Sequence, residues 1–352
     1  MNIGNLDRRR VLGLGLVGVA AAMLSACGNN SGGGGTNNAG GGAGNNGARP
    51  RYQIGVIAKS SGNAVFQAAR QGAVDAARDL GQQMGCDVEI IWKTPNNEDA
   101  QQQAQYIEQL ASQGVDGIAI SCTDANIVTP AIDNAVDQGV TVVTFDSDAA
   151  ASRRMCYYGV DDYTAGRKVM ELLAERMGGE GVVAVLAGNQ AAPNLQARVR
   201  GVREEAGEHD GIQILDVYYH VETPSDAVAR MQQVQTANPQ ITGWALVGGW
   251  PLYTDSALDG IHENAAIVSM DPLELPLNYM ISGQVDALVG QPYYDWGYES
   301  VRLILNKVHH NENPAQELIT VEPDVVASVE AAEALKGRWS RWLSGAGSGG
   351  GE

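Results

Sequence analysis

The chain has 352 residues and a formal net charge of −18, with 44% hydrophobic and 18% charged residues. This length and apolar content suffice to bury a substantial core and favour two domains. The acidic balance excludes the basic face that nucleic-acid recognition requires, so we expect no nucleic acid partner.

Residues 1–26 have the pattern of a signal peptide. Three arginines at positions 8–10 precede the apolar stretch Val11–Leu24, and small residues then lead to Cys27. The apolar stretch is shorter than the about 20 residues that a membrane-spanning helix needs. We therefore predict that this segment is removed and exclude it from the fold.

Two features of the N-terminal region predict how the chain is exported and how it is anchored to the membrane. "LSAC", which ends at Cys27, resembles a bacterial lipoprotein cleavage box and implies lipidation of that cysteine. "RRRVL" resembles a twin-arginine signal, but Asp7 stands where Ser or Thr is usual, so the general export route stays open. Residues 27–50, rich in Gly and Asn, predict a flexible tether on the outer face of the cytoplasmic membrane. Residues 344–352 are predicted to be a disordered tail.

The body alternates short apolar segments with longer amphipathic ones. Strands are predicted at 52–58, 87–92, 117–121, 140–145, 156–160, 181–187, 212–219, 243–248, 265–270, 286–290 and 317–321. Helices are predicted at 63–84, 98–113, 126–138, 161–177, 193–208, 224–237, 252–264, 273–282, 292–309 and about 328–343. Continuously apolar strands between helices indicate an α/β class with doubly wound parallel sheets and right-handed crossovers.

The alternation restarts near residue 155, which predicts two lobes of similar size joined by a hinge. The expected N-terminal lobe comprises 51–161 and 291–318, and the C-terminal lobe comprises 162–290 and 319–343. The expected crossings between lobes lie near Asp161–Asp162, near Gly290–Gln291 and just before Ile319.

The ends of the predicted strands carry the candidate site. Ligands of doubly wound sheets bind beyond the carboxyl ends of the strands. Mostly neutral hydrogen-bonding groups with a few acids stand there, and aromatic rings lie nearby. The candidate ligand residues are Asn63, Phe66, Asp146, Trp250, Asp271 and Gln291. Carboxylates and amides bind hydroxyl groups while rings cover C–H faces, so the pattern predicts a polyhydroxylated ligand.

Six motifs in order resemble the type I periplasmic sugar-binding proteins, the ribose-binding-like family that serves ABC importers. They are "IGVIAKSSGNAVFQAARQGA", "GIAISCTDANIVTPAI", "TFDSDAAASRRMCYYGVDDYTAGR", "NLQARVRGV", "IVSMDP" and "GQPYYDWGYESV". The resemblance spans residues 52–343. It implies that a sugar is captured in a cleft between lobes and delivered to a membrane permease, without a cofactor.

The resemblance also assigns residues and shows departures. It implies ligand contacts for Asn63, Phe66, Asp146, Asp271 and Gln291, and it adds Arg198 from the fourth motif. Where relatives carry a second stacking ring, an arginine after the strand-end Asp, and an Asn-Asp pair, this chain has Val65, Ser147 and Gly248-Gly249-Trp250. These changes leave the identity of the sugar open.

Each candidate also has a structural interpretation. Asn63 could cap a helix, Phe66 could pack in the core, and Arg198 could lie on a helix surface or pair with a carboxylate of the site. Asp146 and Asp271 could cap loops, whereas Trp250 is expected to face the cleft. Asp148, Trp296 and Tyr298 are expected to be structural.

The cysteines and histidines indicate no metal site. Cys86, Cys122 and Cys156 make an odd number, so at least one is a free thiol, and no CxxC or Cys/His spacing accompanies them. The histidines are scattered, and we expect neither metal nor cofactor.

Four functions were compared. We expect a monomeric, non-enzymatic solute-binding lipoprotein. A glycosidase would pair Asp146 with Asp271 or Asp148 and needs one carboxyl of raised pKa, which Arg198 would oppose. A repressor would need an N-terminal helix-turn-helix where the signal peptide lies. A lipoprotein that presents its ligand to a signalling receptor remains an alternative to transport.

Overall fold

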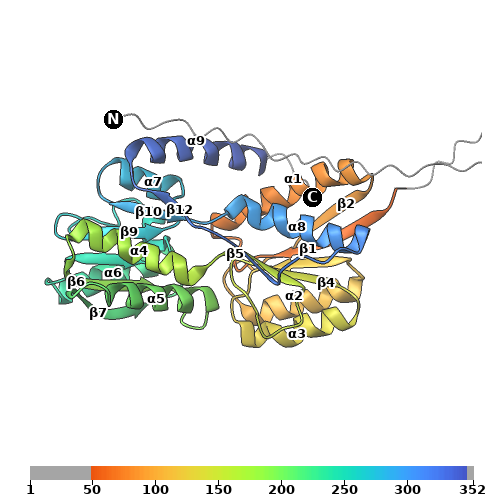
Figure 1. Cartoon of the computed structure of the whole chain (residues 1–352), viewed down its shortest axis with the longest axis horizontal. Helices are drawn as coiled ribbons and strands as arrows, with labels where there is room; N and C mark the ends of the chain where they lie inside the picture. The colour runs from red at the N-terminus through yellow and green to blue at the C-terminus, as the bar shows by residue number, and fades with distance from the viewer. Residues whose placement is uncertain (1–48, 347–352) are drawn as a thin grey trace, which may run out of the picture. The chain divides into compact units, whose positions relative to one another are not determined.

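The computed structural model describes residues 49–346, with side chains as far as Trp339. The expected signal peptide, the lipidated Cys27, the tether up to residue 48 and the tail from residue 347 lie outside the described residues. Within them, two six-stranded sheets with flanking helices form the two lobes of the body (Figure 1).

The sheet of the first lobe is parallel throughout, in the order β11-β5-β4-β3-β1-β2. Its strands are β1 (Arg51–Ile57), β2 (Asp87–Trp92), β3 (Gly117–Ile120), β4 (Thr141–Phe145), β5 (Cys156–Val160) and β11 (Leu318–Val321). Helices α1 (Val65–Met84) and α8 (Tyr293–His310) pack together on one face, and α2 (Ala100–Gln113) and α3 (Ala125–Asp137) on the other (Figure 1).

The sheet of the second lobe repeats this arrangement, in the order β12-β10-β9-β8-β6-β7. Its strands are β6 (Glu180–Ala187), β7 (Gly211–Tyr219), β8 (Gly243–Leu246), β9 (Ala266–Met270), β10 (Ala287–Gly290) and β12 (Asp324–Val326). Only β12, which runs antiparallel to β10, departs from the parallel arrangement in this described sheet. Its helices are α4 (Asp162–Met177), α5 (Pro193–Ala206), α6 (Pro224–Ala237), the 3₁₀ helix η1 (Trp250–Tyr253) and α7 (Glu274–Ile281). The predicted α/β architecture of two doubly wound sheets is confirmed.

A long C-terminal helix, α9 (Val329–Ala346), packs against α7 of the second lobe and also reaches α1 of the first. Trp339 of α9 is buried, and its indole N–H donates to the carbonyl of Pro272 at 2.7 Å. No helix in the described residues is both long enough and apolar enough to cross a membrane.

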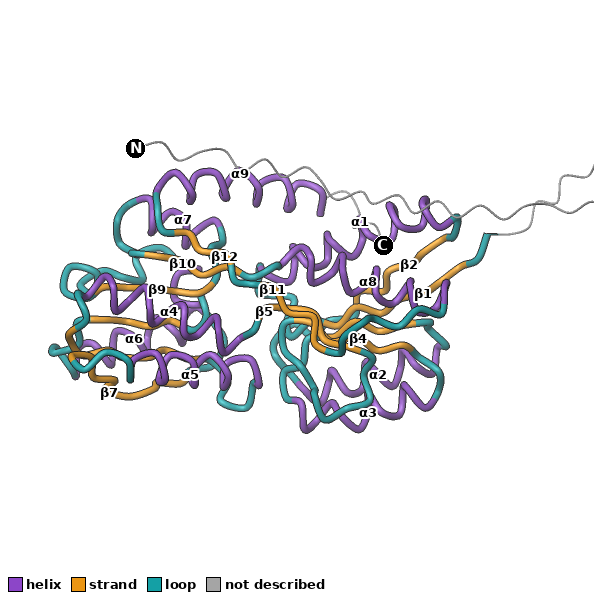
Figure 2. Tube along the Cα trace, in the orientation of Figure 1, coloured by secondary structure: helices purple, strands orange, loops and turns teal. Residues whose placement is uncertain are grey.

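The chain passes between the two sheets three times (Figure 2). The passages follow β5 at residue 161, follow β10 at residues 291–292, and join β11 to β12 at residues 322–323. The last one differs from the expected boundary between 318 and 319. Because Leu318 and Ile319 pair with Tyr157 and Tyr158 of β5, that boundary falls inside a strand of the first lobe.

Three further expectations need correction. Residues 252–264 form a 3₁₀ turn and irregular turns instead of an α-helix, because Ser256 and Gly260 adopt left-handed backbone angles (φ 61° and 76°) that an α-helix cannot contain. The tether was expected to reach residue 50, but Arg49 donates to the carbonyls of Gly81 and Cys86 and so belongs to the body. The tail was expected from residue 344, whereas α9 continues to Ala346.

Candidate functional site

Two aspartates occupy matching places in the two lobes. Asp146 directly follows β4 and Asp271 directly follows β9, strands that hold the same position in their sheets. Both residues adopt the left-handed conformation, with φ of 56° and 69°, and both are 5% exposed. Such a conformation is unfavourable for most residues but accessible to Asp, so the backbone turns sharply there and leaves each carboxylate at the strand end.

The carboxylate of Asp271 is held by four donors. Oδ1 accepts from the amide of Gln291 at 2.9 Å and from the hydroxyl of Tyr293 at 3.0 Å. Oδ2 accepts from the backbone N–H of Gly249 at 2.9 Å and from the hydroxyl of Tyr253 at 3.0 Å. A carboxylate offers about four lone-pair positions, so this one is saturated and rigidly oriented.

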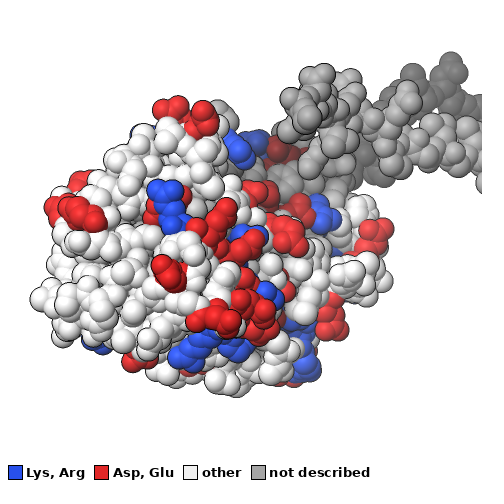
Figure 3. All heavy atoms as spheres, turned by 60° about the vertical axis from the view of Figure 1, so that its left-hand side comes forward, with Lys and Arg blue, Asp and Glu red and all other residues white. Residues whose placement is uncertain are grey.

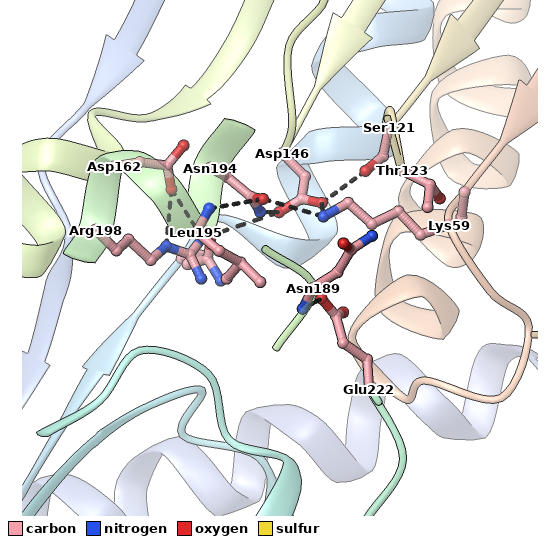
Figure 4. Close-up of polar contacts among 12 residues, drawn as sticks. Lys59, Ser121, Thr123, Asp146, Asp162, Asn189, Asn194, Leu195, Arg198 and Glu222 are labelled. Atoms are coloured by element: carbon pink, nitrogen blue, oxygen red, sulfur yellow. Dashed lines mark hydrogen bonds and ion pairs between the residues drawn. The ribbon is translucent and has the colours of Figure 1, made fainter. Parts of the chain in front are cut away.

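The carboxylate of Asp146 lies where the lobes meet (Figure 4). Its Oδ2 accepts from the hydroxyl of Ser121 at 2.6 Å, and its Oδ1 accepts from the amide of Asn194 at 3.3 Å. The ammonium of Lys59 lies 3.8 Å from Oδ2, and the guanidinium of Arg198 lies 4.0 Å from Oδ1. Asp146 is therefore the acceptor on which groups from both lobes converge.

Arg198 connects these groups. Its Nε donates to Asp162 Oδ1 at 2.9 Å, its Nη1 to the carbonyl of Val247 at 3.1 Å, and its Nη2 to Gln291 Oε1 at 2.6 Å. Helix α5 carries this arginine inward because it packs closely on α4. A Cβ on Gly166 of α4 would lie 2.0 Å from the carbonyl oxygen of Arg198, so only glycine permits that approach.

Burial and neighbouring charges have opposite effects on the pKa values of Arg198 and Asp162, which form an ion pair. Burial lowers the pKa of Arg198, but the carboxylates of Asp162, Asp271 and Asp146 outweigh it and hold the pKa above its ordinary value. Burial raises the pKa of Asp162 to about 6, although Arg198 draws it downward. The guanidinium thus remains charged, whereas Asp162 takes up a proton in mildly acidic solution.

Lys59 is a site residue that the sequence interpretation missed. It lies two residues beyond β1, is 3% exposed, and donates from Nζ to Asn194 Oδ1 of α5 at 3.1 Å, across the two lobes. Burial lowers its pKa, but Asp146, Glu98 and Glu222 together raise it above the ordinary value. Its position just after a predicted strand could have identified it from the sequence, since the other candidates were chosen because they follow predicted strands.

Four of the seven sequence candidates therefore lie in one connected set of contacts: Asp146, Arg198, Asp271 and Gln291. We call this set, together with Lys59, Asn194 and Asp162, the interlobe network. Asn63 is half-buried and its Oδ1 accepts from the backbone N–H of Val65 at 3.2 Å, at the start of α1. Asn63 thus lies just before Ala64, the N-cap of α1, and within the described residues no hydrogen bond or ion pair joins it to the interlobe network.

Phe66 lies in the hydrophobic core. It is 2% exposed, and its ring centroid lies 6.1 Å from that of Trp296, which also contacts Phe145. The core-packing interpretation thus describes its surroundings in this structure. Phe66, like Val65 before it, belongs to the buried face of α1, which explains why its ring points into the core.

Trp250 was expected to face the cleft, but it is only 6% exposed. Its ring covers Gly248, where a Cβ would lie 2.0 Å from a ring carbon, and it stands edge-to-face to His220 at 5.2 Å between centroids. The absence of a side chain at Gly248 lets the indole fold back onto its own loop. Its buried Nε1 has no hydrogen-bond partner among the described residues.

Two remaining expectations concern side chains outside the interlobe network. Asp148 binds Arg154 through both oxygens, at 2.5 and 2.6 Å, which suits the structural role expected for it. Cys86, Cys122 and Cys156 are buried free thiols, and burial raises the pKa of Cys156 to about 11.

Comparisons with known proteins identify similar chains. A family described as "Periplasmic binding protein domain" matches residues 54–312. The chain is 24% identical over 204 residues to the xylitol-binding protein of Mycolicibacterium smegmatis, covering 56% of this chain and 57% of that protein. It is 27% identical over 164 residues to the ribose import binding protein of Bacillus subtilis, covering 47% and 52% respectively. The matched region thus spans just over half the length of these curated relatives.

Solved structures share the fold. A solute-binding protein from Burkholderia graminis in complex with D-arabinose matches with a TM-score of 0.73 and 24% identity, over 79% of this chain and 95% of that chain. One from Bacillus halodurans with bound myo-inositol matches with a TM-score of 0.74 and 20% identity, over 83% of this chain and 99% of that chain. At these identities the likeness concerns the fold.

Proposed function

Because the chain belongs to the periplasmic binding protein family, we propose that it captures a small polyhydroxylated ligand between its lobes and delivers it to an ABC permease. The observation that carries this proposal is the interlobe network, a buried set of carboxylate, amide and cationic groups contributed by both lobes. Relatives named for xylitol and ribose, and structures with arabinose and myo-inositol, support the same ligand class.

The chemistry of the network suits hydroxyl groups. A hydroxyl donates one hydrogen bond and accepts others, so it can donate to the Asp146 carboxylate while accepting from Asn194 or from a cation. The cross-lobe bonds of Asn194, at 3.3 Å to Asp146 and 3.1 Å to Lys59, are contacts that a ligand hydroxyl can replace or supplement. Ligand binding then favours closure in proportion to its higher affinity for the closed state.

We keep Asp146, Arg198, Asp271 and Gln291 as proposed ligand residues and add Lys59 and Asn194. Asp271 and Gln291 also orient other side chains of the network, since each already forms hydrogen bonds within it. For Asn63, Phe66 and Trp250, the local contacts described above favour structural roles. The proposal is one of binding without catalysis, because the family that matches the chain is one of binding proteins.

The family acts outside the cytoplasm, and we propose that a lipid on Cys27 holds the body at the membrane there. We further propose a monomer that docks on its permease, exported through its signal peptide by the general or the twin-arginine route.

A ligand screen tests the function. The melting temperature of the purified protein is measured with pentoses, hexoses, alditols, inositols and nucleosides, and hits are titrated by calorimetry. We expect at least one sugar or polyol to raise the melting temperature in a concentration-dependent way. A shift with another compound class and with no sugar or polyol would refute the carbohydrate proposal.

A further inference from the structure

A cavity of about 770 Å³ is lined by residues of both lobes, and none of the sequence candidates lines it. Glu98, which precedes α2, comes from the first lobe, and the loops after β6 and β7 and helix α6 of the second lobe supply the rest. Its polar lining comprises Glu98, Asn189, Gln190, His220, Glu222, Asp226, Arg230 and Gln233. The volume lies within the range of small-molecule sites, about 300–1,000 Å³.

The cavity adjoins the interlobe network. Asn189 and Glu222 lie beside Lys59 in the close-up view, and both Glu98 and Glu222 act on the pKa of Lys59 (Figure 4). A ligand held by Asp146 and Asn194 can therefore extend one end into this cavity.

The cavity is acidic, and its carboxylates lack cationic partners. Glu98, Glu222 and Asp226 line it with one cation, Arg230, and within residues 49–339 none of the three carboxylates forms an ion pair. Arg230 instead donates to the carbonyl of Tyr219 at 3.1 Å and to the side chain of Gln233 at 3.3 Å. The ammonium of Lys59 is directed to Asn194 and Asp146.

Glu98 and Glu222 are neighbours from opposite lobes. Glu222 Oε1 accepts from the backbone N–H of Asn189 at 2.8 Å, whereas Glu98 Oε2 is buried with no hydrogen-bond partner in the described chain. Burial, followed by the charge of Glu222, raises the pKa of Glu98 well above its ordinary value. A side-chain hydrogen bond to Glu222 also raises this pKa, so the two carboxyl groups share a proton instead of standing as two buried negative charges, which would be costly. An unsatisfied acid of this kind in a cavity is characteristic of a functional site.

We propose that this cavity is a second subsite of the ligand cleft and that it binds a protonated amino group. The ammonium would lie between Glu98 and Glu222, take the place of the proton that they share, donate to the unpartnered Oε2 of Glu98 and balance the charge of the two carboxylates. The ligand is then an amino sugar or an amino alditol. Approach of a cation is favoured as well by the net charge of −18 of the chain, although acidic side chains on the face shown in Figure 3 are interspersed with Lys and Arg. This inference rests on the proposed function.

The test compares compounds that share a carbon skeleton and differ in the charge of a single substituent. Calorimetric affinities are measured at pH 7.5 for glucosamine, glucose and glucuronate, for galactosamine, galactose and galacturonate, and for glucamine, glucitol and gluconate. In a series that binds, we expect the amine to bind about tenfold more tightly than its neutral parent, and the acid not to bind measurably.

Substitutions assign that preference to the cavity. Glu98→Gln combined with Glu222→Gln should abolish the advantage of the amine and leave the affinity of the neutral parent within about threefold. Glu108→Gln, an exposed acid on α2, is the control for a general change in charge. Replacing these acids by amides should not impair folding, and a melting curve checks this. The comparison of charged and neutral ligands in the unmodified protein requires no variant.

The outcomes separate the two proposals. If neutral members bind and the amines do not bind more tightly, or if the double variant keeps the preference, this inference is refuted and the proposed function stands. If the wider screen finds no sugar, polyol or amine that binds, the proposed function fails and this inference fails with it.

Discussion

Asp162 offers a quantitative test of the electrostatics of the site. Its carboxyl is buried beside Arg198, and burial raises its pKa from 3.8 to about 6. A folded-state pKa above the unfolded value means that the folded protein binds more protons between these two values. The stability contributed by this group is therefore complete below about pH 4 and is lost as pH rises through 6.

The size of the effect follows from that shift. One pKa unit corresponds to about 1.36 kcal/mol, so Asp162 alone should lower the free energy of unfolding by about 2 kcal/mol between pH 4 and pH 7. Asp162→Asn removes this titration while keeping the size of the side chain. Relative to the unmodified protein, the variant should become more stable by about 2 kcal/mol over the same pH range.

Urea unfolding at pH 4, 5, 6 and 7 measures this difference, and the comparison cancels groups common to both proteins. Glu108→Gln, which changes the same charge on an exposed surface, should show little pH-dependent difference. A difference between Asp162→Asn and the unmodified protein that stays constant from pH 4 to pH 7 would contradict the reasoning.

Two further predictions concern aromatic residues. Phe66→Leu should lower stability by about 1–3 kcal/mol because it disturbs the contact with Trp296, yet leave ligand affinity unchanged; a large loss of affinity without a loss of stability would instead indicate stacking on the ligand. Trp339→Phe removes the bond to Pro272, beside Asp271, and should weaken ligand binding up to about fivefold, since one hydrogen bond contributes about 1 kcal/mol. The matched control Trp244→Phe removes the hydrogen bond to Gln235 and should lower the melting temperature without changing ligand affinity. If Trp339→Phe and Trp244→Phe changed ligand affinity equally, a link from α9 to the site would be contradicted.

The fold was predictable because its signals are local. Runs such as 117–121 and 140–145 are mostly apolar, without the alternation of a half-exposed strand, and are separated by amphipathic segments, which is typical of helix-covered parallel strands. The failures have physical causes. The apolar periodicity at 252–264 does not reveal the left-handed backbone angles at Ser256 and Gly260. Strand β12 has only three residues, which are too few to show a hydrophobic periodicity.

The site was predictable only in part. Strand ends located Asp146, Asp271 and Gln291, because the topology brings those ends together. Sequence does not show which way a ring turns, so the packing of Trp250 over Gly248 could be seen only in the structure. Pairing between lobes is not encoded in any short segment, which is why Lys59 with Asn194, and Glu98 with Glu222, emerged only from the structure.

The position of β11 has a consequence for biosynthesis. The first lobe receives α8 and β11 only after strands β6 to β10 of the second lobe have been made, and β11 completes its sheet by pairing with β5. A ribosome that has released residues 51–161 has therefore released a lobe without one edge strand and without the helix that covers α1. Because such long-range pairing forms slowly, the two lobes should acquire their final structures nearly together, once the chain is almost complete.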